Sequence, residues 1–263
     1  MELIGYFFAF FVGVIINLLG GGGSTLSIPI FVYLFGVDSH LATSYSLFLV
    51  GTSSLFASIN NIKKGNVLFK QALYFAAPAL IVSLSIRRYI LPRLPEIIQL
   101  SESVAVQKST VIMSFFAVVT LFISISVIRG SKKMTESIPT DYNYPMIFLH
   151  ASLVGIITGF IGVSGGFLLV PAMVLLAKIP MKNAVATTLF VVAMTASTNF
   201  IGDLFTSLLI DWSFLMTYVG IALGGVLLSN LIKNKISNKS LQKIFGYFIL
   251  FLALLVAYLE FSK

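Results

Sequence analysis

The sequence predicts an all-α polytopic membrane protein built from two inverted-topology repeats, each a broken or re-entrant helical hairpin plus three transmembrane helices. Three observations lead to this fold class. Apolar residues make up 58% of the chain and charged residues 10%, whereas a soluble domain carries roughly 25% charged residues. Several stretches are nearly uncharged over the ~20 residues that a membrane-spanning helix needs. A glycine-interrupted apolar segment occurs twice, which is typical of membrane folds with internal repeats.

Eight nearly uncharged segments give the expected elements in order. The first and the fifth are too long for one helix and short for two, and glycines fall near the middle of each. We therefore expect each of these two to form a re-entrant hairpin, with its broken backbone buried in protein. The other six are each expected to form one spanning helix. The segments are residues 3–35, 41–62, 67–91, 103–128, 144–177, 183–202, 207–232 and 240–261.

The glycine-interrupted segment recurs at a constant spacing. Gly155 lies 142 positions after Gly13, and Ser46 and Thr188, at the start of the helices that follow, keep the same spacing. We therefore divide the chain into a first repeat at 1–129, a cytoplasmic linker at 130–143 and a second repeat at 144–263. The further matched pairs are Gly20 with Gly162, Gly23 with Gly165, Leu26 with Leu168, and Pro29 with Pro171.

The basic residues favour an inverted arrangement of the repeats. A hairpin and three spanning helices cross the membrane an odd number of times, so the second repeat would lie upside down relative to the first. Twelve Lys and Arg residues then fall on one face and five on the other, as the positive-inside rule requires. Both termini are expected outside the cytoplasm. The sequence also predicts surface positions, in contact with anionic lipid, for Lys233, Lys235, Lys239 and Lys243.

The two hairpin tips form the predicted binding site. Glycine permits positive φ and close backbone approach, and helices are expected to begin near Ser24 and Gly166, just after each glycine run. Helix N-termini offer free N–H groups and a positive dipole end, which bind a small oxyanion without a formal charge. The predicted substrate contacts are Gly20, Gly21, Gly22, Gly23, Ser24, Tyr45, Ser46, Gly162, Ser164, Gly165, Gly166, Thr187, Thr188 and Asn199.

Several of these residues also have a purely structural interpretation. Small residues let membrane helices pack closely without any ligand, and a tyrosine such as Tyr45 is commonly a packed residue. Asn17 is expected either to join helices or to contact substrate, because an unpaired amide in lipid is unfavourable. His40 and Lys182 occupy equivalent positions before the two hydroxyl-bearing helices. They are either gate residues that attract anions or ordinary interfacial residues.

The composition excludes other kinds of chemistry. The chain has no cysteine, so disulfides, thiol catalysis and cysteine-ligated metals are excluded, and we expect neither a cofactor nor a metal. The net charge is +8, but the basic residues stand at helix ends, which argues against nucleic acid as a partner. No Asp or Glu falls in the middle of a span, so the sequence shows no carboxylate proton relay.

These motifs resemble the sulfite exporter TauE/SafE family of membrane proteins. The resemblance covers nearly the whole chain. It rests on the stretches GGGGSTLSIP at 20–29 and GVSGGFLLVP at 162–171, and on the Asp211-Trp212 pair. It implies a transporter in a bacterial or archaeal cytoplasmic (inner) membrane that exports sulfite, organosulfonates or related small sulfur-containing anions. The family pattern has Thr-Ser where this chain has Tyr45-Ser46.

The expected mechanism is alternating access, with substrate bound between the two tips while one half or one hairpin bundle moves against the other. The alternatives are a passive anion channel and a carrier of other small organic anions. An intramembrane serine protease is a remote alternative. Residues 162–165 match a nucleophile motif around Ser164, yet neither His40 nor His150 follows that serine. The expected partners are the anionic substrate and membrane lipid, and a homodimer is left open.

Overall fold

Two groups of helices make up the structure, a computed structural model that describes residues 2–90, 93–95, 97–101, 104–130, 144–161, 166–205, 209–233 and 235–261. Unit 1 comprises Met1–Leu73, Ser164–Val170 and Met181–Ser237, and unit 2 comprises Tyr74–Val163, Pro171–Pro180 and Asn238–Lys263. Each unit takes segments from both predicted repeats. The division into repeats stays a prediction, and nearly all of the linker lies outside the described residues.

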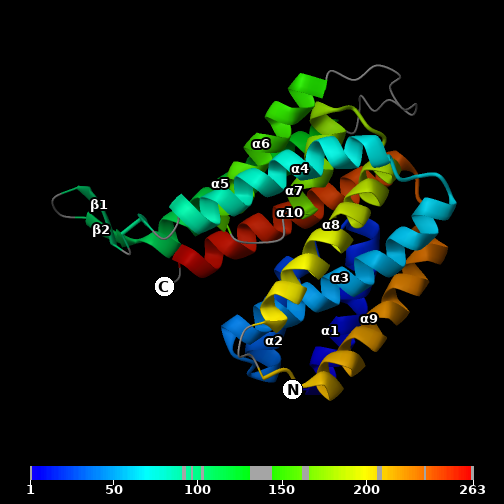
Figure 1. The fold of residues 1–263 in the computed structure, drawn as a ribbon, viewed down its shortest axis with the longest axis horizontal. Helices are drawn as coiled ribbons and strands as arrows, with labels where there is room; N and C mark the ends of the chain where they lie inside the picture. The colour runs from blue at the N-terminus through cyan, green and yellow to red at the C-terminus, as the bar shows by residue number, and fades with distance from the viewer. Residues whose placement is uncertain are drawn as a thin grey trace. The chain divides into compact units, whose positions relative to one another are not determined.

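The helices follow one another in the predicted order (Figure 1). A broken pair, α1 (Glu2–Leu19) and α2 (Ser24–Phe35), precedes α3 (Ser39–Lys63), α4 (Phe69–Ser85) and α5 (Lys108–Gly130). A second broken pair, α6 (Tyr144–Ile161) and α7 (Gly166–Pro171), precedes α8 (Met181–Leu204), α9 (Trp212–Lys233) and α10 (Asn238–Phe261). Two π-helical turns continue α4 and α7, namely η1 (Ile86–Ile90) and η4 (Ala172–Leu176).

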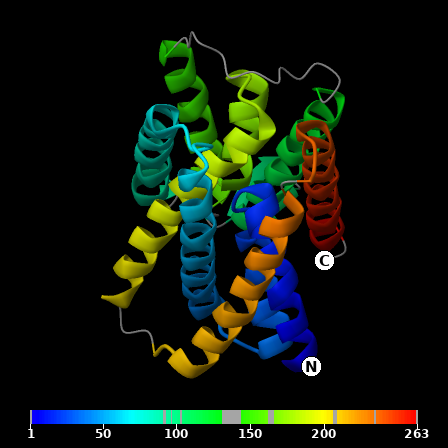
Figure 2. The ribbon, with the colours of Figure 1, turned by 90° about the vertical axis from the view of Figure 1, so that its right-hand side faces the viewer.

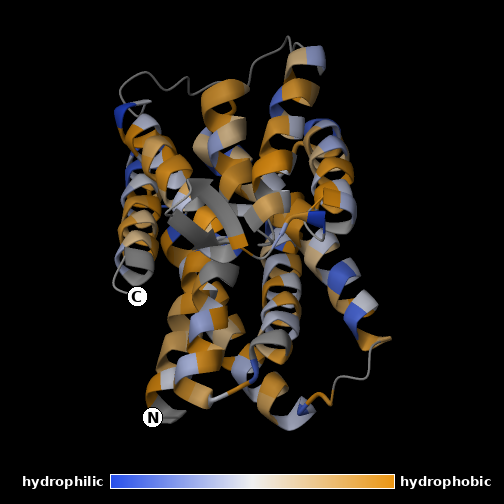
Figure 3. Ribbon diagram, turned by 90° about the vertical axis from the view of Figure 1, so that its left-hand side faces the viewer, coloured by the Kyte–Doolittle hydropathy of each residue, from blue (hydrophilic) through white to orange (hydrophobic). Residues whose placement is uncertain are grey.

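Five helices of the described chain are long and apolar enough to cross a membrane, and they belong to α3, α5, α8, α9 and α10. Shorter apolar helices lie in α1, α2, α4 and α6. Figure 3 shows hydrophobic residues, in orange, in most of the helices. The all-α, multi-pass membrane class is therefore confirmed. The inverted relation of the two repeats stays a prediction.

The helix boundaries recur at the spacing of the sequence motif. α6 begins and ends 142 residues after α1, and α8 begins 142 residues after α3. α2 begins at Ser24 and α7 at Gly166, which are the two predicted starts. The agreement stops at α5, because a β-hairpin precedes that helix, whereas the described residues between α9 and α10 include no strand.

This β-hairpin was not predicted. β1 (Ile97–Ser101) pairs antiparallel with β2 (Val104–Gln107), with Ile98 opposite Val106. Several β-branched residues lie in this stretch, and such side chains favour strands. The predicted helix over 103–128 therefore starts later than expected, at Lys108.

In unit 1, α1 runs beside α9 in the same direction (Figure 2). Glycines lie at the crossing on both helices. A Cβ atom added to Gly13 would be 2.7 Å from the carbonyl carbon of Ala222, and one added to Gly225 would be 3.0 Å from that of Phe10. Backbones this close leave no room for a side chain, which is the usual role of small residues between membrane helices.

The helices α3 and α8 pack against each other in opposite directions. The Ser44 hydroxyl near the start of α3 donates to the Asp203 carboxylate near the end of α8. At the other end, the Asn183 amide of α8 donates to the Asn66 carbonyl, just after α3, over 3.1 Å. These contacts fix the register of the pair.

An aromatic cluster closes the open end of the first hairpin in unit 1. Its rings come from α1, α2, α3 and α9, and the shortest centroid distance, between Phe31 and Tyr218, is 4.6 Å. Offset and edge-on ring pairs of this kind stabilise a core beyond their area alone. The cluster consists of Tyr6, Phe31, Phe35, Tyr45, Phe214 and Tyr218.

Unit 2 has a comparable glycine crossing. A Cβ atom on Gly155 of α6 would lie 2.6 Å from the Ala79 carbonyl oxygen of α4. Gly155 is the residue matched to Gly13. Within unit 2 it packs α6 against α4, just as Gly13 packs α1 against α9 within unit 1. α10 packs along α5, where Gln242 donates to the Val127 carbonyl over 2.8 Å.

Replacing Gly225 by Ala is expected to destabilise the protein by about 1–3 kcal/mol, because the added methyl group would push α9 away from α1. Gly220→Ala is the matched control on the same helix, since a Cβ atom there meets nothing within 4 Å. It should be neutral or stabilising by about 0.5–1 kcal/mol, through the higher helix propensity of Ala. Thermal unfolding in detergent compares the two, and equal melting temperatures would contradict the close crossing.

Candidate functional site

The first glycine tip is a tight turn that needs glycine at two positions. Gly20 and Gly21 have φ values of +78° and +97°, which side chains disfavour. Their N–H groups both donate to the Ile16 carbonyl, over 2.9 and 3.1 Å. The chain then enters α2 at Ser24, with Gly23 as the N-cap residue. The Leu26 and Ser27 N–H groups of this first turn donate to the Gly23 carbonyl, over 3.2 and 3.0 Å. The N–H groups of Ser24 and Thr25, the first two residues of the helix, have no acceptor inside it.

The start of α7 lies against this tip. A Cβ atom added to Gly166 would be 3.3 Å from the Gly20 carbonyl oxygen and 3.5 Å from that of Gly21. Val192 of α8 lies within 3.0 Å of such atoms built on both Gly21 and Gly166. Gly166, at the end of the second glycine run, therefore lies against the first tip in unit 1, although the two are far apart in the sequence.

The predicted hydroxyl groups lie in the interior of unit 1. Ser46 is buried, and its hydroxyl shares a 2.7 Å hydrogen bond with that of Ser27 on α2. Thr187 is fully buried and accepts a hydrogen bond from the Leu68 N–H over 3.1 Å. Thr188 is buried beside it on α8. These contacts give a structural role to two of the predicted substrate-contacting residues, Ser46 and Thr187.

Tyr45 links the predicted site to the start of α9. Its hydroxyl accepts a hydrogen bond from the Asp211 N–H over 2.8 Å. The Asp211 carboxylate in turn accepts from the Phe214 N–H over 3.0 Å, which is the geometry of a helix N-cap. The Asp-Trp pair of the sequence thus begins α9 at Trp212.

The other predicted residues are less tightly defined by the structure. Gly22 is buried in the tip, while Asn199 and Lys182 are half-buried on α8. The side chains of Ser24 and His40 are not among the described ones, although Ser24 begins α2 and His40 is the second residue of α3. Gly162, Ser164 and Gly165 lie outside the described residues. A role in substrate binding stays a prediction for every residue of the site.

A buried lysine beside the tip was missed. Lys233 was predicted at the membrane surface, but only 6% of it is exposed, which corrects that expectation. Its Nζ donates to the Asn17 carbonyl over 3.1 Å, near the C-terminal end of α1, where basic side chains commonly bind the last carbonyl groups. The Asn17 amide donates to Ser229 over 2.7 Å and to Asn230 over 2.9 Å, so Asn17 joins α1 to α9.

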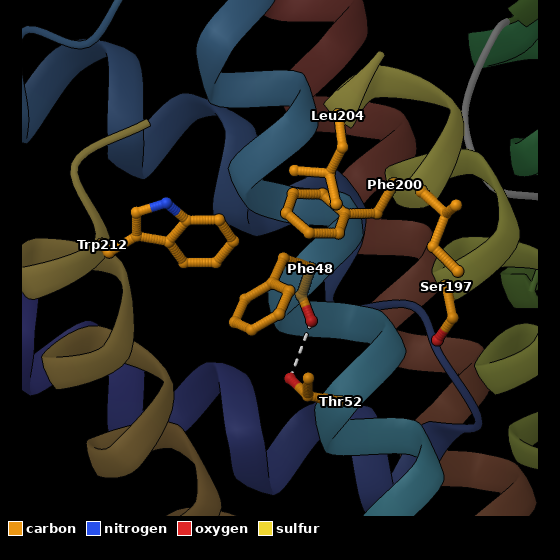
Figure 4. A pocket seen from close by; sticks show the side chains of 7 residues that line it. Phe48, Thr52, Ser197, Phe200, Leu204 and Trp212 are labelled. Atoms are coloured by element: carbon orange, nitrogen blue, oxygen red, sulfur yellow. Dashed lines mark hydrogen bonds between the residues drawn. The ribbon is translucent and has the colours of Figure 1, made fainter. Parts of the chain in front are cut away.

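A separate apolar cavity of about 310 Å³ lies in unit 1, on α3, α8 and the start of α9 (Figure 4). Titratable side chains do not line it. Within the described part of the chain, no three His, Asp or Glu residues gather in a way that could hold a metal ion.

Comparisons with known proteins agree on one family. The family model described as "Sulfite exporter TauE/SafE" matches residues 6–256. A "Probable membrane transporter protein" of Xylella fastidiosa (strain 9a5c) is 26% identical over 267 residues, covering 96% of this chain and 93% of that protein. "Probable membrane transporter protein YunE" of Bacillus subtilis (strain 168) is 22% identical over 259 residues, covering 88% of each.

Replacing Lys233 by Met is expected to destabilise the protein by about 1–3 kcal/mol, because the Asn17 carbonyl loses a hydrogen-bond donor in a buried place. Lys235→Met is the control, since Lys235 is exposed two residues away. Thermal unfolding of the purified protein measures both. Equal melting temperatures for the two variants would show that the Lys233–Asn17 bond contributes nothing to the fold.

Proposed function

The chain belongs to the sulfite exporter TauE/SafE family of membrane transporters, and from this premise we propose that it exports small sulfur-containing anions such as sulfite or organosulfonates. The family and the names of the relatives indicate a transporter and not an enzyme, so we do not pursue the protease interpretation of Ser164. The proposed substrate site is the pair of glycine tips, and the proposed mechanism is alternating access.

The meeting of the two glycine segments is the observation that carries this proposal. Gly166 approaches the backbone of Gly20 and Gly21, and α2 starts three residues after Gly21 with N–H groups that its own helix does not use. Broken backbone inside an apolar chain is tolerated where it lines a cavity or is buried in protein. Discontinuous helices of this kind commonly bind the substrate in secondary transporters.

A basic residue near the tip supports an anionic substrate. The Lys233 side chain is held at Asn17, three residues before Gly20, so a basic group lies near the turn. Neutral donors on α2, α3 and α8 complete the surroundings. A site with one nearby lysine and several neutral donors attracts a small oxyanion but does not surround it with charge, which favours release.

The antiparallel packing of α3 and α8 supports the proposed inversion of the repeats. These helices start 142 residues apart, and an inverted pair related by a two-fold axis would run in opposite directions, as they do. We propose on this basis that the protein lies in the cytoplasmic membrane with both termini outside the cytoplasm.

Ligand binding tests the proposed site. Purified protein is heated with sulfite, thiosulfate, sulfoacetate, taurine or sulfate, and one of the sulfur anions is expected to raise the melting temperature. At 100 times its Kd, a ligand stabilises the folded state by about 2.7 kcal/mol. The shift should be lost in Gly20→Ala, whose added methyl group would meet Val170 at 2.8 Å.

Gly65→Ala is the matched control for this binding assay. Gly65 also has a positive φ, +67°, but a Cβ atom there meets nothing within 4 Å, so both variants carry backbone strain and only one crowds the tip. Loss of the ligand shift in both variants, or in neither, would contradict a site at the tip. A folded protein that responds to none of these anions would contradict the substrate class and leave the family assignment intact.

Flux measurements separate the carrier from the channel. Proteoliposomes preloaded with unlabelled anion should take up labelled anion faster than empty ones, because alternating access exchanges substrate across the membrane. A flux that rises linearly with anion concentration, and that is the same in preloaded and empty proteoliposomes, would identify a passive pore.

A further inference from the structure

An apolar cavity on the flank of unit 1 has no part in the proposed transport site. Its volume is about 310 Å³, at the lower end of the range for ligand pockets. Figure 4 shows Phe48, Phe200 and Trp212 turned toward one another across it, with Thr52 and Ser197 at one side. Ile201 and Leu204 complete the lining.

The walls of the cavity have apolar chemistry. The ring centroids are 4.8 Å apart for Phe48 and Phe200 and 5.9 Å apart for Phe48 and Trp212. The Thr52 hydroxyl is directed to its own helix, where it donates to the Phe48 carbonyl over 2.7 Å. A cavity with such walls does not retain water and takes apolar molecules instead.

The cavity faces away from the glycine tip. Val192 on α8 contacts the tip, and Ile201 lies nine residues further along the same helix. At ~100° per residue, nine residues place Ile201 on roughly the opposite side of α8. The rim is apolar and open, since Ile201, Leu204 and Trp212 are 53%, 44% and 44% exposed. These residues belong to helices that are long and apolar enough to cross a membrane, so a lipid chain suits this rim chemically.

Charge around the rim selects among lipids. Two acidic residues are sequence neighbours of the lining residues at this end of the helices, Asp203 beside Leu204 and Asp211 beside Trp212. The described basic residues of unit 1 stand at the other ends of these helices or in the segments that follow them. Anionic headgroups would meet like charge at this rim. The unit 1 lysines are Lys63, Lys64, Lys70, Lys182, Lys233 and Lys235.

We propose that this cavity is a lipid site, which holds the acyl chain of a zwitterionic phospholipid. The chain end lies toward Thr52 and Ser197, which are further from the end of α8 than Leu204, and the headgroup lies beyond Trp212, whose indole is typical of the membrane interface. The volume corresponds to roughly ten water molecules of ~30 Å³ each, which suits part of one acyl chain and excludes a headgroup. This site is independent of the anion transported.

The single tryptophan of the chain provides the test, because Trp212 lines the cavity. The full chain is reconstituted in phosphatidylglycerol vesicles that contain increasing fractions of phosphatidylcholine with dibrominated acyl chains, which quench tryptophan fluorescence on contact. Wild type should reach half-maximal quenching at a bromolipid fraction about three- to tenfold lower than a variant with a filled cavity, as for a preferred site.

Thr52→Leu fills the cavity and Thr198→Leu is its matched control. Both threonines donate to the carbonyl four residues earlier, Phe48 for Thr52 and Met194 for Thr198, but Thr198 is exposed and does not line the cavity. The quenching that wild type shows at low bromolipid fractions should disappear in Thr52→Leu and persist in Thr198→Leu. It should weaken when the bromolipid carries an anionic phosphatidylglycerol headgroup.

Three results would overturn the proposal. Identical quenching curves for wild type and Thr52→Leu would mean that Trp212 meets only the surrounding bilayer. Stronger quenching by brominated phosphatidylglycerol would contradict the zwitterionic headgroup. Protection of Trp212 from all bromolipids, together with cross-linking of the chain into dimers, would place a second copy over the cavity.

Discussion

A helix that ends within an apolar chain exposes carbonyl groups that lipid cannot satisfy. α1 ends in this way at Leu19, and its last carbonyls find donors inside unit 1. The turn brings the N–H groups of Gly20 and Gly21 back to Ile16, and Lys233 reaches across from α9 to Asn17. The direction in which α2 leaves, and the surface on which Gly166 rests, both follow from how this end is closed.

Small polar side chains serve the fold as well as the proposed site. Ser46 bonds to Ser27 and thereby joins α3 to α2. Thr187 holds the Leu68 N–H at the start of α4, and Tyr45 holds Asp211 where α9 begins. Because these hydroxyls also fix helix positions, loss of transport in a variant at any of them has two explanations. A pair of glycine variants with similar positive φ values separates loss of substrate binding from displacement of a helix more clearly.

Much of the fold could be predicted because the repeat is visible in the sequence. The broken segments, the helix starts at Ser24 and Gly166 and the glycine-dependent turn all follow from local chemistry. The burial of Lys233 could not be predicted, because its acceptor lies 216 residues away and a lysine at the end of a span usually reaches the surface. The β-hairpin was missed because its strands are short, and because β1 lies between two predicted spans while β2 lies at the start of the second one. The contacts of Tyr45 depend on α9, so its own segment gave no sign of them.

The glycine crossing between α1 and α9 joins parts of the chain that are made at very different times. At about 5–20 residues per second of synthesis, roughly ten seconds or more separate Gly13 from Gly225. During that interval α1 is in the membrane with its glycine face uncovered, available to lipid or to another nascent chain. Unit 1 is complete only when nearly all of the protein has been inserted. Membrane insertion and helix assembly are therefore separate stages for this protein, and a stalled chain would leave the surface that α9 normally covers exposed.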